Sequence, residues 1–399
     1  MRRTVRDNLG WKIRLGNEAS TKEIFSTILR QKEFENNIAL YDLSKINSLV
    51  ERWHQKLPLI RPFYAVKSNP DPEMMLRMAS LGLGFDCASK NELEFAQNTN
   101  VNFETDVICA QPFKSQRDLR AISNLGVKYT TFDCVEELQK ISNFGLKNLK
   151  MILRIQAGDE ESASQYNQKF GALSSEYDNI FEFAIELGMN IVGISFYVGH
   201  SMKNTIAYYH AIKKASEAWK IAENYGFAME ILDVGGGFNE KYFDRAANDI
   251  NRGISEFFRE KNIKIIAEPG KYLSASVVSS CFTVVGKRSR VINGETHIDY
   301  ILSDGVEGTL RFLPYADDNL PVPIYMGDPE NPPKFHSTFF GPTCSGDDRI
   351  YDHDFPSVDI GDKICFDVMG SYSVSWGTNF NSIPMITHTK LYIDEDMDN

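Results

Sequence analysis

Three consecutive segments decide the fold: MEILDVGGGF (residues 229–238), DRAANDINRGISEFFREK (244–261) and KIIAEPG (264–270). The first and third are short, continuous apolar runs, which are typical of strands whose sheet is covered by helices. The middle segment has the length and apolar spacing of an amphipathic helix. Together they predict one strand–helix–strand unit of a parallel sheet.

The same alternation begins near residue 37 and repeats about eight times, the number of units in a closed parallel barrel. The repetition and total length fit a (β/α)₈ barrel better than an open doubly wound sheet. No GxGxxG motif follows the first strand, so a dinucleotide-binding fold is not indicated. We therefore expect residues 35–272 to form a TIM-like barrel, with further strands at 37–43, 61–67, 84–89, 106–110, 128–133, 150–156 and 190–199.

After residue 271 the pattern changes to alternating, β-branched segments separated by loops rich in Gly, Pro and Asp. Such segments as IDYILSD (298–304) and DKICFDVMG (362–370) predict an all-β domain, a sandwich or barrel, over residues 273–399. Residues 20–33 look helical, and we expect residues 1–34 to pack with this β domain. The expected fold class is thus α/β plus all-β.

The composition limits the function. A net charge of −11 over 399 residues leaves no excess of Lys and Arg, which argues against nucleic acid or an anionic membrane as the main partner. No apolar run reaches the length of a membrane-spanning helix, and the N-terminus lacks a signal-peptide core. The six cysteines are scattered, without a CxxC motif or a zinc-like Cys/His spacing, so we expect no metal. Reduced thiols in such a chain predict a cytoplasmic protein.

Functional groups of a parallel barrel lie at the carboxyl ends of its strands. Lys67 ends RPFYAVK (61–67) and is either a solvated lysine or a desolvated amine able to form a Schiff base. VGGGF (234–238) leaves backbone amides unobstructed, which suits a phosphate, although a flexible turn has the same composition. Glu268 ends an otherwise apolar run and needs a partner, either a protonated ring nitrogen or a surface lysine.

Each of these three signals is weak alone, but their combination is fairly specific. An imine-forming lysine, an anion-binding glycine triplet and a buried carboxylate at strand ends of one barrel describe a site for pyridoxal 5′-phosphate. We therefore expect this cofactor.

Longer motifs resemble a known family over most of the chain. The sequence is similar to the eukaryotic ornithine decarboxylases, which are fold-type III pyridoxal-phosphate decarboxylases. The resemblance implies an alanine racemase-like barrel with a β domain, and a homodimer whose subunits share the active sites. The matching motifs are PFYAVKSNPDP (62–72), GLGFDCASKNELE (82–94), TFDCVEELQKI (131–141), LRIQAGDE (153–160), KFGA (169–172), LDVGGGF (232–238), AEPGKY (267–272), GPTCSGDDRI (341–350) and VMGSYSV (368–374).

The resemblance also implies roles for individual residues. Lys67 would carry the cofactor and Glu268 would pair with its ring nitrogen. Gly235, Gly236 and Gly237 would bind the phosphate, joined by Tyr372 of the β domain. Cys344 of the other subunit would protonate the substrate's Cα after CO₂ leaves. Further positions that match the family's site or dimer contacts are Asp86, Glu92, Arg154, Lys169, Gly270, Lys271 and Gly370.

Two departures from the family concern the substrate's far end. Ser345 follows Cys344 where the family has an aspartate, and Ala316 follows Tyr315 where it has a second one. Those carboxylates fix the distal ammonium of a diamino acid, and burying that ammonium without them costs several kcal/mol. Either Asp317 or Asp318 reaches in as a replacement, or ornithine is not the preferred substrate.

Two other departures lie around the cofactor. Tyr197 replaces a histidine that stacks on the ring, and Tyr cannot carry the same charge. Lys271 replaces an arginine at the phosphate, so a point charge replaces a bidentate fork. His200 stands where the family has a serine, and it either compensates or is a partly exposed loop residue. In the β domain, His336 or Asp347 could supply new groups, although a solvated loop is the favoured interpretation of each.

Two classes of function compete. The first is an active amino-acid decarboxylase of the amine and polyamine type with an altered substrate. The second is a weak or inactive relative that, like the antizyme inhibitors, binds an antizyme-like regulatory protein. The enzyme is favoured, because the changes cluster at the substrate tail and the phosphate while these residues are retained: Lys67, Asp86, Arg154, Glu268, Cys344 and Gly370.

Overall fold

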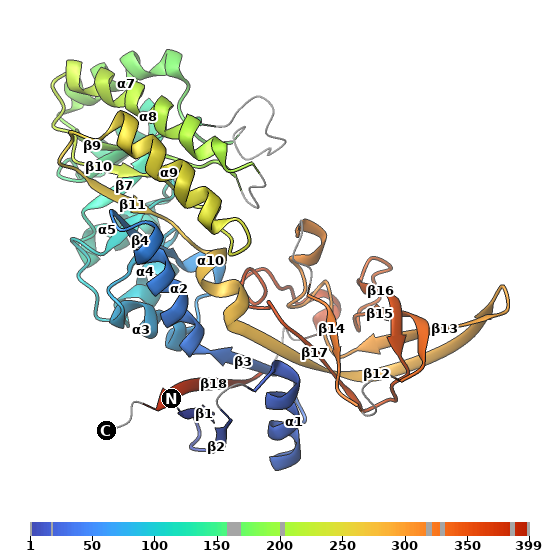
Figure 1. The fold of residues 1–399 in the computed structure, drawn as a ribbon. Helices are drawn as coiled ribbons and strands as arrows, with labels where there is room; N and C mark the ends of the chain where they lie inside the picture. The colour runs from blue at the N-terminus through green and yellow to red at the C-terminus, as the bar shows by residue number, and fades with distance from the viewer. Residues whose placement is uncertain are drawn as a thin grey trace. The chain divides into compact units, whose positions relative to one another are not determined.

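The computed structural model describes residues 2–16, 19–157, 169–199, 204–316, 321–327, 332–383 and 388–396. The chain divides into two compact units, drawn together in Figure 1. One unit is residues 48–273. The other combines residues 1–47 with residues 274–399.

The first unit contains a closed parallel barrel, so the predicted barrel is confirmed. One apolar layer fills its interior, with Phe63, Ile152 and Ile231 among its buried side chains. Gly84 makes room for this layer, because a Cβ there would lie 2.5 Å from the Phe63 ring. The barrel strands are β4 (Ile60–Ala65), β5 (Gly84–Cys87), β6 (Val107–Cys109), β7 (Tyr129–Phe132), β8 (Lys150–Ile155), β9 (Asn190–Phe196), β10 (Ile231–Asp233) and β11 (Lys264–Ala267).

Helices follow the strands and cover the outside of the barrel (Figure 1). Their ends carry the expected capping residues: Asp71 accepts hydrogen bonds from the first turn of its helix, and Pro72 opens that helix. The helices are α2 (Leu43–Lys56), α3 (Pro72–Ser80), α4 (Lys90–Gln97), α5 (Gln116–Leu125), α6 (Val135–Asn143), α7 (Tyr177–Leu187), α8 (Ile206–Asn224), α9 (Phe243–Phe257) and α10 (Lys271–Ser274).

The second unit is built on a ten-stranded mixed sheet, which confirms the predicted all-β region. Along its main path the strands run in the order β16-β15-β13-β12-β3-β18-β1-β2, and β17 pairs with both β12 and β14. The strands are β1 (Arg2–Arg6), β2 (Lys12–Leu15), β3 (Ile38–Asp42), β12 (Val278–Ile292), β13 (Glu295–Leu302), β14 (Pro323–Tyr325), β15 (Lys334–Phe340), β16 (Arg349–Pro356), β17 (Lys363–Phe366) and β18 (Thr389–Asp396).

Two N-terminal elements belong to this mixed sheet. Helix α1 (Thr21–Gln31) buries Ile24, Phe25 and Ile28 in the apolar core of the unit. Strand β3, which the sequence predicts as a strand at the start of the barrel, instead pairs with β12 and β18. The closed barrel therefore begins with β4.

Candidate active site

The candidate site is built where the barrel strands end. Lys67 lies in the 3₁₀ turn η1 (Val66–Ser68), directly after β4, and Glu268 directly follows β11. The Ala65 N–H donates to the Pro269 carbonyl oxygen at 3.2 Å, which holds these two strand ends side by side. A Cβ on Gly270 would lie 3.1 Å from the Ser68 Cβ, so this glycine lets the two turns approach closely.

Lys67 is paired with Asp86 of β5. Its Nζ atom contacts the Asp86 Oδ2 atom. The Asp86 side chain is fully buried, whereas 44% of the Lys67 side chain is exposed. The Asp86 Oδ1 atom is buried and has no hydrogen-bond partner within the described residues. The amine is thus neither free in solvent nor deeply desolvated; a buried carboxylate holds it at the open end of the barrel.

Glu268 faces a second buried acid, Asp233, the last residue of β10. Burial raises the pKa of Glu268 well above its ordinary value, and repulsion from Asp233 and Asp86 adds to the rise. Burial likewise raises the pKa of Asp233 to about 6. The negative charge of Asp233 opposes ionisation of Glu268, which favours the protonated form of Glu268.

The glycine triplet forms a tight turn beside these acids. Gly235 has φ +66°, and a Cβ there would overlap the Phe196 carbonyl oxygen. Its N–H donates to the Asp233 Oδ1 atom at 2.9 Å, and its carbonyl oxygen accepts from the Glu268 N–H at 2.7 Å. Within the part of the chain that the structure describes, the N–H groups of Gly236 and Gly237 donate no hydrogen bond. Two adjacent backbone donors are therefore available to an anion.

Aromatic and basic groups lie beside this turn. The Arg154 guanidinium carbon is 5.8 Å from the centroid of the Tyr197 ring. A Cβ on Gly236 would be 3.6 Å from Tyr197 Cε2, so this ring lies against the glycine turn. Tyr208, which is fully buried, donates its hydroxyl hydrogen to the Gly236 carbonyl oxygen at 2.8 Å.

The other predicted site residues of the barrel unit are Glu92, Lys271, Lys169 and His200. Glu92 Oε2 accepts the Ala88 N–H at 2.6 Å, and burial raises the pKa of Glu92. Lys271 opens α10, and Lys169 lies 4.8 Å from the centroid of the Phe170 ring. His200 lies outside the described residues.

In the other unit, Cys344 lies in an exposed turn that a buried acid braces. Asp348 accepts the Thr343 hydroxyl at 2.6 Å and the Val306 N–H at 2.6 Å. The Cys344 N–H donates to the Asn381 Oδ1 atom at 2.8 Å. Ser345 Oγ accepts the Asp347 N–H at 3.3 Å. The turn is therefore well anchored, while the Cys344 side chain faces solvent in the single chain.

A row of aromatic rings lies beside the predicted substrate-tail residues. Tyr315, at the end of η5 (Leu313–Tyr315), is 55% exposed and packs edge-on against Trp376 at 5.7 Å. Trp376 is 41% exposed and also lies 5.1 Å from the Tyr372 ring. Ala316 follows Tyr315, whereas Asp317 and Asp318 lie outside the described residues. Tyr372 has φ +55°, a strained conformation that is frequent at functional sites.

Three other predicted residues of this unit, Gly370, His336 and Asp347, have the following positions in the structure. A Cβ on Gly370 would overlap the Ser274 carbonyl oxygen, so the glycine permits a close backbone approach. His336 lies on strand β15 beside His297, and the interpretation as a loop residue was wrong because the segment pairs with β13 and β16. Asp347 is an exposed turn residue.

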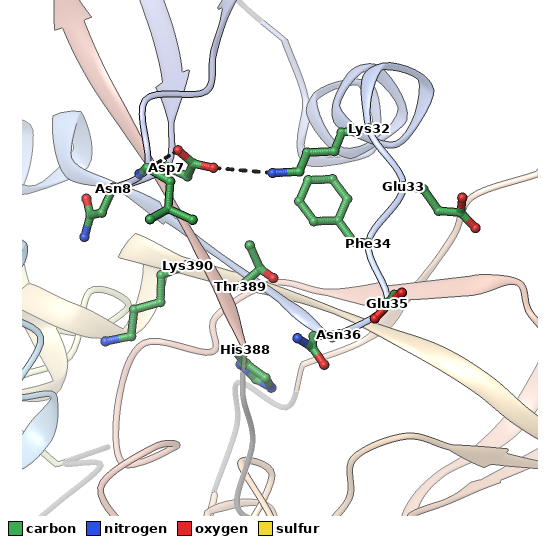
Figure 2. A pocket seen from close by; sticks show the side chains of 11 residues that line it. Asp7, Asn8, Lys32, Glu33, Phe34, Glu35, Asn36, His388, Thr389 and Lys390 are labelled. Atoms are coloured by element: carbon green, nitrogen blue, oxygen red, sulfur yellow. Dashed lines mark hydrogen bonds and ion pairs between the residues drawn. The ribbon is translucent and has the colours of Figure 1, made fainter.

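A pocket of about 480 Å³ occurs elsewhere in the same unit (Figure 2). Figure 2 shows Lys32 pointing toward Asp7, with its Nζ atom 3.4 Å from Oδ2. His388 lies on another side of this pocket. None of the predicted site residues lines it, so the pocket is separate from them. Among the described residues, no group of three metal-ligating side chains occurs, and no helix is long and apolar enough to cross a membrane.

The barrel and its strand-end residues together define a pyridoxal-phosphate enzyme. The chain belongs to the pyridoxal-dependent decarboxylases: residues 43–275 match the family described as "Pyridoxal-dependent decarboxylase, pyridoxal binding domain". The predicted family, enzyme class and cofactor are therefore confirmed.

Relatives and solved structures extend the likeness to nearly the whole chain. The ornithine decarboxylase of Caenorhabditis elegans is 34% identical over 365 residues, covering 88% of this chain and 86% of the relative. Antizyme inhibitor 2 of Xenopus laevis is 34% identical over 367 residues, covering 88% of this chain and 80% of the relative. The arginine decarboxylase of Paramecium bursaria Chlorella virus has a similar structure, with a TM-score of 0.87 and 31% identity, covering 93% of this chain and all of that one.

The residues of the barrel mouth fit the cofactor. Two buried aspartates, Asp86 and Asp233, and the partly buried Glu268 interact with the basic groups of Lys67 and Arg154. One Oδ atom of each aspartate has no donor within the described residues. A protonated ring nitrogen would supply a positive charge and a proton donor at Glu268. The free amides of the glycine turn suit the phosphate.

Sequence reasoning missed Asp233, Asp348 and Trp376. Asp233 had a signal, because it ends an apolar strand just as Glu268 does. Asp348 lies in the motif that contains Cys344, but the sequence does not show which of the two adjacent acids, Asp347 or Asp348, is buried. Trp376 gave no signal.

Proposed function

We propose that the protein decarboxylates an amino acid whose side chain does not end in a short-chain ammonium group. The decarboxylase class follows from the family, and the substrate is the proposal. The observation that carries it is the aromatic surface of Tyr315 and Trp376, which stands beside Ala316 where a carboxylate would be needed for ornithine.

The barrel residues would hold the cofactor in three places. Lys67 would bind it through the amine that Asp86 now holds, and Glu268 would face its ring nitrogen. The amides of the glycine turn would receive the phosphate, with Lys271, His200 and Tyr372 as further proposed ligands. When bound, this cofactor supplies an electron sink for the bond to the departing carboxylate.

Proton delivery falls to another residue. Cys344 would give the proton of its Sγ atom to the substrate's Cα once CO₂ has left. Its side chain is exposed in the single chain, so we propose that a second subunit covers it and that the active sites are shared in a homodimer. The cytoplasmic location remains a prediction.

Substrate preference would come from the rings of Tyr315, Tyr372 and Trp376. Their exposed faces offer apolar and cation–π contacts, which favour an apolar or planar side chain over a strongly hydrated primary ammonium. Burying that ammonium without a carboxylate would cost several kcal/mol. Asp317 or Asp318 would have to enter the site for ornithine to be preferred.

A regulatory binding protein is the second candidate, and the likeness to antizyme inhibitor 2 favours it. The contacts of the barrel mouth speak for the enzyme, since Lys67 keeps its buried partner Asp86, and Glu268 and the glycine turn remain in place. An antizyme-like partner and catalysis are not mutually exclusive.

The deciding experiment incubates the purified, cofactor-loaded protein with a broad panel of amino acids and identifies the amines released. We expect an apolar, aromatic or guanidinium amino acid to be turned over at least 10-fold more efficiently than ornithine. Ornithine as the best substrate would reject the substrate proposal, and no turnover of any amino acid, together with antizyme binding, would favour the regulatory alternative.

A further inference from the structure

Asp233 is a buried acid for which the proposed function has no role. It ends β10 and is fully buried. In the strand register it lies beside Ser195 of β9, which lies beside Arg154 of β8. Neighbouring residues in register on a parallel sheet point to the same side. Asp233, Ser195 and Arg154 therefore form one polar level at the carboxyl ends of three adjacent strands.

The two oxygens of Asp233 have different surroundings. Oδ1 accepts the Gly235 N–H at 2.9 Å and fixes the first residue of the glycine turn. The same residue accepts the Glu268 N–H on its carbonyl oxygen at 2.7 Å. Oδ2 is buried and has no hydrogen-bond partner within the described residues. Asp233 thus contacts the glycine turn directly and acts on the ionisation of Glu268 through its charge.

We propose that Asp233 is a positioning residue that joins the two halves of the cofactor site, holding the glycine turn with Oδ1, and through that turn the Glu268 backbone, and favouring the protonated form of Glu268 through the charge of its buried carboxyl group. This inference rests on the proposed roles of Glu268 and the glycine turn. It extends them because it makes phosphate binding and the protonation of Glu268 depend on one side chain.

The charges around Asp233 explain why this side chain would affect the protonation of Glu268. Asp86 repels a negative charge at Asp233, whereas Arg154 attracts it. Asp233 and Asp86 repel a negative charge at Glu268, whereas Lys67 attracts it. Without the cofactor, protonation of one of these acids relieves the repulsion between Asp233 and Glu268. A protonated ring nitrogen brings a positive charge to this place and removes the need for that proton.

The pH dependence of the cofactor-free protein follows from this. The pKa of Asp233 is raised from 3.8 to about 6, so the folded state binds a proton more tightly than the unfolded state. Its contribution to stability is therefore present below about pH 4 and is lost as the pH rises through about 6. The cofactor-free protein should melt at lower temperature as the pH rises over this range, and the loaded protein should show a smaller slope.

Two variants separate the two functions of the side chain. Asp233→Asn keeps an oxygen for the Gly235 N–H but removes the titrating carboxyl, whereas Asp233→Ala removes both. Asp106→Asn is the matched control, because Asp106 precedes β6 at the opposite end of the barrel strands and pairs with Arg61 at 2.8 Å.

The first measurement is the affinity of each cofactor-free variant for pyridoxal phosphate and for pyridoxal, which lacks the phosphate. We expect Asp233→Ala to weaken pyridoxal phosphate binding by about 10-fold or more and pyridoxal binding by much less. Asp233→Asn should keep the preference for the phosphate within about 3-fold of the wild type, as expected when the accepting oxygen is conserved. Equal losses for both ligands in Asp233→Ala, or wild-type affinities, would overturn the link to the turn.

The second measurement is the melting temperature of each cofactor-free protein from pH 4 to 7. Asp233→Asn should flatten the wild-type slope, and Asp106→Asn should retain it. An unchanged slope in Asp233→Asn would overturn the link to Glu268. If the proposed decarboxylase function is itself wrong, the result is different: the wild-type protein does not bind pyridoxal phosphate. If Asp233→Ala does not fold, the melting curves of Asp233→Asn still test the effect of Asp233 on Glu268.

Discussion

Lys67 and Asp86 form an ion pair in which the acid is fully buried and 44% of the lysine side chain remains exposed. The pair stands at the ends of two neighbouring barrel strands, so the amine is held in place yet stays accessible to an incoming carbonyl. Removal of either partner therefore has two separable effects, one on the stability of the cofactor-free protein and one on attachment of the cofactor.

Lys67→Ala should destabilise the cofactor-free protein, because Asp86 would be left buried without a counter-charge. The cost of breaking a buried pair is reduced by the solvent exposure of the lysine, and we expect about 1–2 kcal/mol. Lys67→Arg should recover most of this stability but should not restore the yellow colour of the bound cofactor, since a guanidinium does not replace the amine. Urea denaturation and visible absorbance check both effects. A yellow Lys67→Arg protein would contradict the assigned attachment point.

Gly235→Ala should damage the phosphate-binding turn. The new Cβ would overlap the Phe196 carbonyl oxygen, and φ of +66° adds about 1–2 kcal/mol of backbone strain. Gly226→Ala is the matched control, because Gly226 has φ +88° but nothing within 4 Å of a Cβ. Cofactor affinity should fall only in Gly235→Ala, while both variants lose stability. Equal cofactor affinities in the two variants would argue against the turn as the phosphate site.

Asp348→Ala should destabilise the turn that presents Cys344. Three hydrogen bonds to a buried carboxylate would be lost, from the Val306 N–H and from the N–H and hydroxyl of Thr343. We expect a loss of about 2–3 kcal/mol in the free energy of unfolding, together with reduced turnover. Asp347→Ala, an exposed neighbour, should change stability by less than about 0.5 kcal/mol. A stability loss in Asp347→Ala that matched that of Asp348→Ala would show that burial is not the cause.

Carboxylates returned to the substrate tail should shift preference toward ornithine. We expect the double substitution Ala316→Asp and Ser345→Asp to raise kcat/KM for ornithine by about 10-fold or more, the value of one charge-assisted hydrogen bond. Thr296→Asp adds one negative charge, half of what the double variant adds, at an exposed position of β13, and it should leave kcat/KM for ornithine unchanged. If the double variant is no better on ornithine than the Thr296→Asp control, the tail does not bind at these positions.

Much of the barrel could be predicted because its strands are continuous apolar runs followed by capped helices. Strand β3 has the same buried pattern, IALYD, yet it pairs in the mixed sheet. Local sequence reports burial and not the identity of the partner strand. Strands β1 and β2 were not predicted because charged residues interrupt them; their backbone pairing with each other and with β18 forms them.

The candidate site was predictable where one strand end carries one functional group. Lys67, Glu268 and the glycine triplet follow from that rule, and applied to the whole of LDVGGGF it would also have identified Asp233. The contact between Tyr315 and Trp376 could not be deduced, because it joins distant parts of the chain. The effect of Asp233 on the ionisation of Glu268 likewise depends on burial and distance, which a sequence does not state.

The most direct test of the proposed function is the release of CO₂ by the cofactor-loaded protein from a panel of amino acids at equal concentration, with ornithine included. Decarboxylation of an apolar, aromatic or guanidinium amino acid at a kcat/KM at least 10-fold above that for ornithine is the predicted result. Ornithine or lysine as the preferred substrate would contradict the proposal, and it would mean that another carboxylate replaces those missing at Ala316 and Ser345.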